Sequence, residues 1–280
     1  MNFENVCVAG LGQVGLPTAS YIAEKGFQVV GYDIDESKVR SAKESGLHAT
    51  RDWNEIPGSD AYVVCVSTSW RTDGPDFSAL QDIAGRIRGS AKRGALISVE
   101  STTLPGACRG IFGSKLPETG GLVHVPHRYW AGDPKEHGVR QLRVIGALDQ
   151  ASMRLGRAFY ETNLDIPLEV VEPLEIAELS KIVENSHRYV QIAFAEEVRM
   201  ICDASNLDFE TLRRACNSKW NVDVLEARDG IFGHCLPKDI EYLRHIAGSE
   251  PHLLTGAAEA DRAYRESIQA KRRLPSSRPS

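Results

Sequence analysis

The feature that most constrains the fold is a short apolar run that leads into a glycine turn near the N-terminus. The run NVCVA at residues 5–9 is followed by GLGQVG at residues 10–15 and by a helix-like segment at residues 17–25. A second apolar run, FQVVGY, occupies residues 27–32. Glycines at this spacing permit a tight turn, close approach of a pyrophosphate and packing of the helix on the strand. This order predicts a dinucleotide-binding strand, turn and helix, with the phosphates at the helix N-terminus.

Asp33, directly after the second run, indicates which dinucleotide binds. Its position is close to the spacing of about 20 residues at which a ribose-binding acid is expected. A carboxylate here would accept hydrogen bonds from both hydroxyls of the adenine ribose and repel a 2′-phosphate, so the sequence favours NAD over NADP. The alternative is a generic glycine turn. The predicted cofactor-binding residues are Gly10, Gly12, Gln13, Val14, Gly15, Asp33, Ser67, Thr68 and Glu100.

Five further apolar runs predict a parallel sheet that is covered by helices on both faces. These runs lie at residues 61–66, 95–99, 121–125, 142–145 and 166–171. We interpret residues 1–172 as a doubly wound α/β domain of the Rossmann type. Ligands of such sheets bind beyond the carboxyl ends of the strands, so polar residues there are site candidates, although each could be an ordinary cap or turn residue. They are Ser67, Thr68, Glu100, Ser101, Thr102, His127 and Arg128.

A change of pattern after residue 172 predicts a second, all-helical domain over residues 173–272. Residues 174–205 contain neither Gly nor Pro and carry apolar side chains at helical spacing, so we expect one unusually long helix. Shorter helices, predicted at residues 209–215 and 252–271, would cover only part of its apolar stripe. We therefore expect a homodimer through the long helix, and a disordered tail over residues 273–280.

Two polar residues of the long helix, Lys181 and Asn185, are four positions apart and therefore lie on one helix face. This pair can be interpreted as part of a solvated polar face. It can also be interpreted as two hydrogen-bond donors aimed into a cleft.

One cysteine has the surroundings of a nucleophile. Cys235 lies in GIFGHCLPKD, residues 230–239, between two glycines and the carboxylate of Asp239. The glycines permit a sharp turn and close approach of a substrate, and His234 and Lys238 supply positive charge that favours the thiolate. The competing interpretation is that Cys235 is a small buried apolar residue, which is the commonest role of a free cysteine.

Composition excludes several classes of protein. The net charge of −5 gives no basic surface for nucleic acid. The six cysteines show no zinc-ligand spacing, so no metal site is predicted. We find no signal peptide and no apolar stretch long enough to span a membrane. We therefore expect a cytoplasmic protein whose partner is a small molecule.

The motifs resemble those of the UDP-glucose/GDP-mannose dehydrogenase family from Val6 to about Lys271. The matching segments, in order, are GLGQVGLPTASYIAEKGFQVVGYD, VSTSWRTDGPDFS, ESTTLPG, VPHRYWAGD, AELSKIVENSHRYVQIAFAEE and GIFGHCLPKD. The resemblance implies oxidation of a primary alcohol to a carboxylate with two NAD through a cysteine thioester. It further implies that Cys235 is the nucleophile, that Lys181 and Asn185 stabilise the oxyanion, that Asp239 holds a water and the lysine, and that Thr102 binds water near the nicotinamide.

Two departures from the family pattern change the expected substrate and chemistry. His127 stands where the family has a glutamate, and we expect a histidine of ordinary pKa to act as the base instead. The chain also ends where the family's third, nucleotide-diphosphate-binding domain should begin, which suggests either a shortened lineage or a missing end. We expect a compact substrate with a phosphate, phosphonate or carboxylate group, held by Arg128, Arg188, Lys219 and Arg228.

Three alternatives to this function remain open. The protein could be a UDP-sugar 6-dehydrogenase in which a partner replaces the missing domain. It could be a two-electron dehydrogenase of the 3-hydroxyacid type, which also uses a lysine and an asparagine four residues apart but does not need Cys235. It could also bind NAD without catalysis. The number of hydrides removed per substrate separates the first two from each other.

Overall fold

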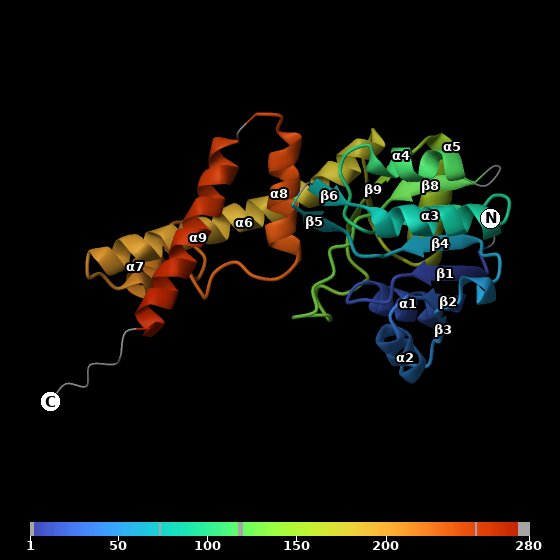
Figure 1. Ribbon diagram of the computed structural model, residues 1–280, viewed down its shortest axis with the longest axis horizontal. Helices are drawn as coiled ribbons and strands as arrows, with labels where there is room; N and C mark the ends of the chain where they lie inside the picture. Colours follow the sequence, from blue (N-terminus) through green and yellow to red (C-terminus); the bar gives the residue numbers. More distant parts are fainter. Residues whose placement is uncertain (1–2, 73, 117–119, 250, 274–280) are drawn as a thin grey trace. The chain divides into compact units, whose positions relative to one another are not determined.

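The computed structural model describes residues 3–72, 74–116, 120–249 and 251–273, and it divides into two compact units (Figure 1). The first unit covers residues 1–181 and the second covers residues 182–280. The division lies within the long helix, later than the predicted domain boundary at residue 172. The predicted disordered tail lies outside the described residues except for Arg273, the last residue of the last helix.

An eight-stranded sheet forms the centre of the first unit, in the order β10-β9-β8-β7-β4-β1-β2-β3. Its strands are β1 (Asn5–Ala9), β2 (Gln28–Tyr32), β3 (His48–Thr50), β4 (Ala61–Val64), β7 (Leu96–Val99), β8 (Gly121–His124), β9 (Arg143–Ala147) and β10 (Leu168–Val170). From β3 to β8 all neighbours are parallel. After the glycine turn, β2 and β3 extend the sheet on one side of β1, and the next strand of the sheet, β4, lies on the other side of β1. This reversal of strand order confirms the doubly wound architecture.

The sheet is not wholly parallel, which corrects one expectation. Strand β9 runs antiparallel to β8, with Val123 opposite Ala147, and β10 is parallel to β9. A parallel neighbour needs a crossover, usually a helix. Residues 125–142 between β8 and β9 contain no helix, so the chain returns in the opposite direction. A separate antiparallel pair is formed by β5 (Ser69–Arg71) and β6 (Gly74–Asp76).

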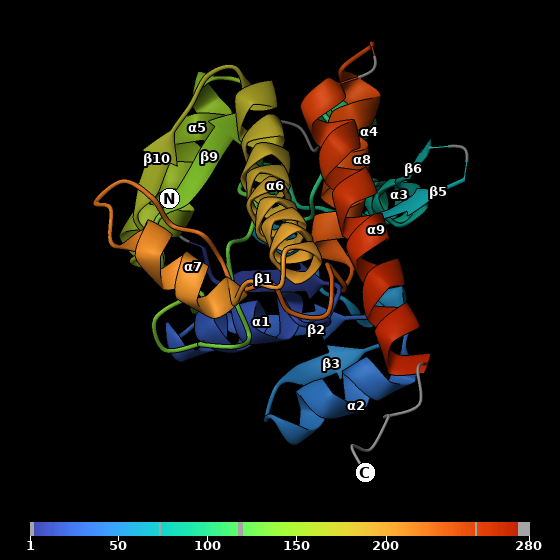
Figure 2. The same cartoon turned by 90° about the vertical axis from the view of Figure 1, so that its left-hand side faces the viewer.

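Helices cover both faces of the sheet. One apolar core joins the sheet to α1 (Gly15–Glu24), α2 (Glu36–Glu44) and α5 (Gln150–Arg157), and Figure 2 shows α1 and α2 beside β1, β2 and β3. The other core joins it to α3 (Ser78–Ser90) and α4 (Ala107–Phe112). Both cores contain alternating residues of the same strands, since successive side chains point to opposite faces.

The second unit is helical, as predicted. Its helices are α6 (Leu174–Ala204), which begins in the first unit, α7 (Phe209–Asn217), α8 (Cys235–Ile246) and α9 (His252–Arg273). One apolar core joins α6, α8 and α9 with the loop at Ile231, and another joins α6 to α7 and to residues 222–227. Helix α8 was not predicted from the sequence. Among the described residues, no helix has the length and apolar character needed to span a membrane.

Candidate functional site

The glycine turn between β1 and α1 has the shape that a dinucleotide pyrophosphate requires. Gly10 has a φ of +92°, and a Cβ there would lie 2.6 Å from the carbonyl oxygen of Cys65. A Cβ at Gly15 would lie 1.7 Å from the carbonyl oxygen of Gly10, whereas a Cβ at Gly12 would meet no described atom within 4 Å. The backbone is therefore closed at Gly10 and Gly15 and open at Gly12, where the phosphates approach.

The N-terminus of α1 is available to an anion. Its N-cap, Val14, makes no side-chain cap, and the first turn contains no acidic residue. The free N–H groups at a helix N-terminus carry partial positive charge and are directed outward along the helix axis, so they can bind a phosphate. Gln13 and Val14, both predicted to bind the cofactor, occupy the turn directly before this helix.

Asp33 is held in a fixed orientation at the end of β2. Its Oδ2 accepts a 2.7 Å hydrogen bond from the amide of Leu11, and its Oδ1 accepts a 2.9 Å bond from the amide of Asp35. The carboxylate is thereby attached to the glycine turn itself. This is the arrangement expected of a ribose-binding acid, so the residues present fit NAD.

The ends of β4 and β7 bring further predicted residues together. The hydroxyl of Thr68 donates to the carbonyl oxygen of Thr102 at 2.9 Å, and the hydroxyl of Ser101 donates to that of Val66 at 2.7 Å. Thr68 is buried, whereas Ser67 is exposed and Thr102 is half-buried. The hydroxyl of Thr68 therefore connects two loops, and Ser67 and Thr102 are the more accessible members of this group.

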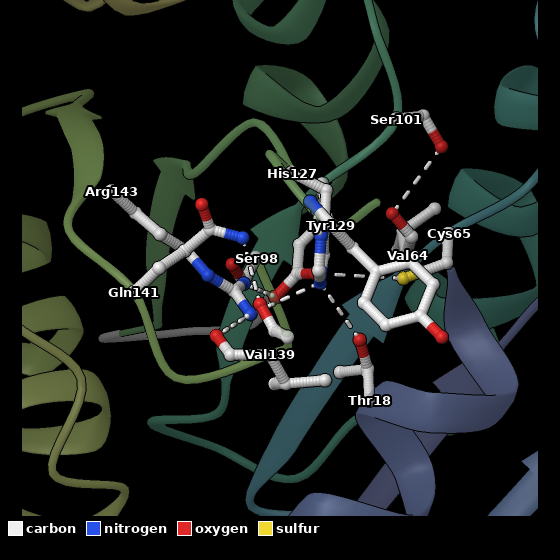
Figure 3. Close-up of polar contacts among 12 residues, drawn as sticks. Thr18, Val64, Cys65, Ser98, Ser101, His127, Tyr129, Val139, Gln141 and Arg143 are labelled. Carbon is white, nitrogen blue, oxygen red and sulfur yellow. Dashed lines mark hydrogen bonds and ion pairs between the residues drawn. The ribbon is translucent and has the colours of Figure 1, made fainter. Parts of the chain in front are cut away.

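Glu100, predicted to bind the cofactor, lies in a buried polar network instead. Figure 3 shows Arg143, His127 and Thr18, three other members of this network. The Oε1 of Glu100 accepts hydrogen bonds from Arg143 Nη1 at 3.0 Å and from the hydroxyl of Tyr160 at 2.6 Å. The side chains of Glu100 and Arg143 are 0% exposed. A buried ion pair of this kind is retained when the remaining donors and acceptors are also satisfied. Here most of them are satisfied: Arg143 Nη2 also donates to the carbonyl oxygen of Val139 at 2.8 Å, and Tyr160 contacts Ser98. Arg143 Nε is the exception, since it has no hydrogen-bond partner among the described residues.

His127 belongs to the same network, and its surroundings do not suit a base of ordinary pKa. Its Nδ1 accepts from the amide of Tyr129 at 2.9 Å, so the neutral ring carries its proton on Nε2. Nε2 lies 3.0 Å from Thr18 Oγ1 and 3.0 Å from Arg143 Nη2. Burial lowers the pKa of His127 well below its usual value, and the charges of Arg143 and Lys181 lower it further. The expectation of an ordinary pKa is therefore wrong.

In the second unit, Cys235 is exposed at the first position of α8. The preceding glycines, Gly230 and Gly233, have φ values of +108° and +92°, which side chains other than glycine rarely adopt. An exposed thiol at a helix N-terminus can act as a nucleophile because the helix dipole favours the thiolate.

A polar chain connects α8 to α6 within the second unit. Asp239 is fully buried, and its carboxylate accepts hydrogen bonds from Asn185 on α6 and from the neighbouring Lys238. Lys238 also lies over the ring of Tyr242, with Nζ 4.3 Å from the centroid. Asn185 and Asp239, both predicted site residues, are therefore in direct contact.

The other basic candidates are spread over both units. Lys181 is half-buried on α6. Arg128 Nη1 donates to the carbonyl oxygen of Leu142 at 3.0 Å. In the second unit Arg188 is exposed on α6, Lys219 is exposed after α7, and Arg228 pairs with Glu226. Arg128 and Lys181 thus belong to the first unit, and the other three belong to the second.

Two buried charged residues of the first unit, Arg143 and Glu178, were missed from the sequence. Arg143 stands within an apolar run, and a charged residue there was the signal that could have identified it. Glu178 on α6 accepts from the amides of Gly106 and Cys108 at 2.6 and 2.8 Å, and so caps the start of α4. Burial raises the pKa of Glu178 despite these hydrogen bonds.

The glycine turn, Asp33 and the doubly wound sheet define the class of NAD-binding Rossmann domains. The model of the UDP-glucose/GDP-mannose dehydrogenase family, NAD binding domain, matches residues 4–48 and 40–164, and the model of the family's central domain matches residues 175–262. The chain belongs to this family, and its cofactor is NAD.

Known relatives agree with this assignment. The chain is 30% identical over 259 residues to UDP-N-acetyl-D-mannosamine dehydrogenase of Methanocaldococcus jannaschii, a match that covers 84% of this chain and 60% of that protein. It is 31% identical to the Salmonella typhimurium protein of the same name, covering 93% of this chain and 70% of the relative. The structure of a UDP-D-ManNAc dehydrogenase from Pyrococcus horikoshii superposes with a TM-score of 0.84 at 26% identity. This match covers 95% of this chain and 70% of the other.

Proposed function

We propose that the protein is an NAD-dependent dehydrogenase that oxidises a primary alcohol to a carboxylate in four electrons. The observation that carries the proposal is Cys235, an exposed thiol at the start of α8 behind two glycines with positive φ. The family and the dehydrogenases named above support it. A two-electron oxidation would need no such residue, since only the second oxidation requires a nucleophile to add to the aldehyde.

The proposed reaction removes the two hydrogens bound to one carbon, each as a hydride. NAD, when bound at the glycine turn, would supply the hydride acceptor for each oxidation. After the first, the thiolate of Cys235 adds to the aldehyde carbon and forms a C–S bond, which gives a thiohemiacetal. The second oxidation converts it to a thioester. Water then attacks the carbonyl carbon, the C–S bond breaks, and the electron pair returns to the sulfur of Cys235. One alcohol, two NAD and one water yield one carboxylate, two NADH and three protons.

Roles for the other residues follow from their chemistry. Lys181 and Asn185 are proposed to stabilise the oxyanion by donating hydrogen bonds. Asp239 is proposed to orient Asn185, with which it is bonded, and to position water. Thr102 is proposed to bind water near the nicotinamide. His127 is assigned no proton transfer, because burial keeps it neutral. We propose that it holds the glycine-turn helix to the Glu100 network through Thr18.

The substrate is proposed to be a primary alcohol that carries an anionic group. The named relatives are dehydrogenases of UDP-N-acetyl-D-mannosamine, and the chain spans about 60% of the length of the archaeal one. Arg128, Arg188, Lys219 and Arg228 are proposed to bind the anionic group. Whether the substrate is a nucleotide sugar or a smaller phosphorylated alcohol is decided by comparing NADH production from both kinds of compound.

The test is the number of NADH formed per acid, measured in wild type and in Cys235→Ser. We expect two NADH per acid in the wild type, and loss of acid formation with retention of NAD binding in Cys235→Ser. Cys216→Ser, which alters a half-buried cysteine of α7, is the control and should keep activity. One NADH per substrate with an active Cys235→Ser would indicate the 3-hydroxyacid type. NAD binding without turnover of any alcohol would indicate a binding protein.

We also propose that the protein forms a homodimer through α6. Val183, Phe194 and Ile201 are 44%, 56% and 58% exposed. They are separated by eleven and seven residues, which places them within about 20° of one another around the helix at about 100° per residue. Light scattering should report a dimer, and Phe194→Glu should shift it to a monomer. Leu253→Glu, at an exposed apolar residue of α9, should leave the dimer intact.

A further inference from the structure

Asp261 on α9 is a buried carboxylate that receives hydrogen bonds from separate parts of the second unit. It is 1% exposed. Its Oδ1 accepts from the amide of Ile231 at 2.8 Å, and its Oδ2 accepts from the hydroxyl of Tyr189 on α6 at 3.1 Å. Arg265 Nη2, one helical turn further along α9, lies 2.9 Å from the same Oδ2. One side chain therefore joins α6, α9 and the loop before α8.

The loop held by Asp261 is the one that leads to Cys235. Ile231 is 4% exposed and packs in a core with Tyr189. A Cβ at Gly230 would lie 2.4 Å from Cγ of Arg265 and 3.4 Å from Oδ1 of Asp261. The backbone of the loop is thus pressed directly against α9. Its buried amide at Ile231 has a charged acceptor, and such a bond is stronger than one between neutral groups.

The contacts on α6 place this anchor beside the proposed catalytic residues. Tyr189 follows Asn185 by four residues, so the two side chains share one face of α6. Asn185 bonds to Asp239 on α8, and Tyr189 bonds to Asp261 on α9. Consecutive turns of α6 are therefore attached to the helix that begins at Cys235 and to the helix that anchors the loop before it.

We propose that Asp261 is a positioning residue for Cys235: by holding the amide of Ile231 and the hydroxyl of Tyr189, it fixes the loop that presents the thiol at the start of α8. The catalytic consequence rests on the proposed function, whereas the anchor itself does not. A nucleophile must be held close to its productive position, because a displacement of about 1 Å can reduce the rate about 100-fold.

The surroundings of Asp261 include a second acid, Glu196 on α6. The ionisable groups that act on Asp261 are Arg265 on α9 and Tyr189 and Glu196 on α6. Burial and the charge of Asp261 raise the pKa of Glu196 to about 8, so its carboxyl group is mostly neutral at pH 7.

The test is hydrogen exchange of the Ile231 amide and the rate of thiol labelling in the full chain of Asp261→Ala. Loss of a hydrogen bond to a charged group is expected to raise exchange at Ile231 by a factor on the order of ten. Labelling at Cys235 should change relative to labelling at Cys216 in the same molecule, whereas general loosening would change both. Tyr189→Phe removes one hydrogen bond only and should give the same effects at smaller size. Glu259→Gln, an exposed acid of the same helix, is the control.

The outcomes separate the anchor from the proposed reaction. If exchange at Ile231 rises and acid formation falls at least about tenfold while NAD affinity is unchanged, the anchor and its catalytic role are supported. If exchange rises in a protein whose wild type forms no acid, the anchor stands and the proposed function fails. Unchanged exchange and an unchanged Cys235 to Cys216 labelling ratio in both variants would overturn the proposal. Should Asp261→Ala not fold, Tyr189→Phe decides it.

Discussion

Each unit of the molecule contains a buried glutamate, and the two are kept buried in different ways. Glu100 in the first unit accepts hydrogen bonds from Arg143 and Tyr160. Glu196 in the second unit is 0% exposed, and neither of its side-chain oxygens has a hydrogen-bond partner among the described residues. A buried carboxyl group is tolerated when a partner compensates its charge or when it remains protonated. Glu100 illustrates the first solution and Glu196 the second.

The charges around Glu196 explain why it remains protonated. Burial raises its pKa, the nearby carboxylate of Asp261 raises it further, and Arg265 lowers it, with a result of about 8. Arg265 is already paired with Asp261 and so compensates only one of the two acids. By contrast, Arg143 forms an ion pair with Glu100 and with no other acid among the described residues. Glu100 in the first unit is thus held by an ion pair, whereas Glu196 in the second unit is an acid that can gain or lose its proton near neutral pH.

The largest effect is expected where the ion pair of the first unit is broken. Arg143→Met leaves Glu100 without its positive partner and should lower the free energy of unfolding by about 3–5 kcal/mol, measured by urea denaturation at pH 7. Arg140→Met is the control, because its pair with Asp165 is 59% and 63% exposed and should contribute little to stability. Equal effects of the two variants would contradict the assigned role of Arg143.

In the second unit we expect a substitution of the buried glutamate to raise the free energy of unfolding, by a smaller amount. Because the folded pKa of Glu196 is raised, the native protein binds a proton that the unfolded chain has released between about pH 4.5 and pH 8. Its contribution to stability is therefore present at low pH and is lost as the pH rises through that window. Glu196→Gln should be more stable than wild type at pH 8.5 by about 1–3 kcal/mol.

Urea denaturation at several pH values from 5 to 8.5 measures this difference. Glu197→Gln, the exposed neighbour on the same helix, is the control and should follow the wild-type pH dependence. If Glu196→Gln and wild type differ by the same amount at every pH, Glu196 does not titrate in this range, and the contrast with Glu100 fails.

The sequence predicted the parts of the molecule that depend on local pattern. The glycine turn, Asp33 and the 31 residues of α6 follow from spacing and periodicity, and the structure has them where they were predicted. The local pattern could not predict the partner of Glu100, because Arg143 is 43 residues away in the sequence. Arg143 also lies on β9, and the antiparallel direction of that strand was not predicted either. Nor could it predict that Asp261 contacts Ile231, 30 residues earlier. Cys235, Asn185 and the other site residues keep the roles proposed for them until activity is measured.

The smallest effect concerns His127, the histidine that contacts the Glu100 network. Burial and the charge of Arg143 lower its pKa, so the native state keeps the ring neutral where the unfolded chain takes up a proton. Its contribution to stability is therefore present above the unfolded pKa near 6.5 and is lost as the pH falls below it, by about 1 kcal/mol between pH 6.5 and pH 5.5. His127→Gln should remove this part of the acid dependence, and His48→Gln, at an exposed histidine, should not. Denaturation curves at the two pH values measure the difference. An unchanged acid dependence in His127→Gln would mean that His127 is protonated beside Arg143, and the network would then hold two positive side chains against the single carboxylate of Glu100.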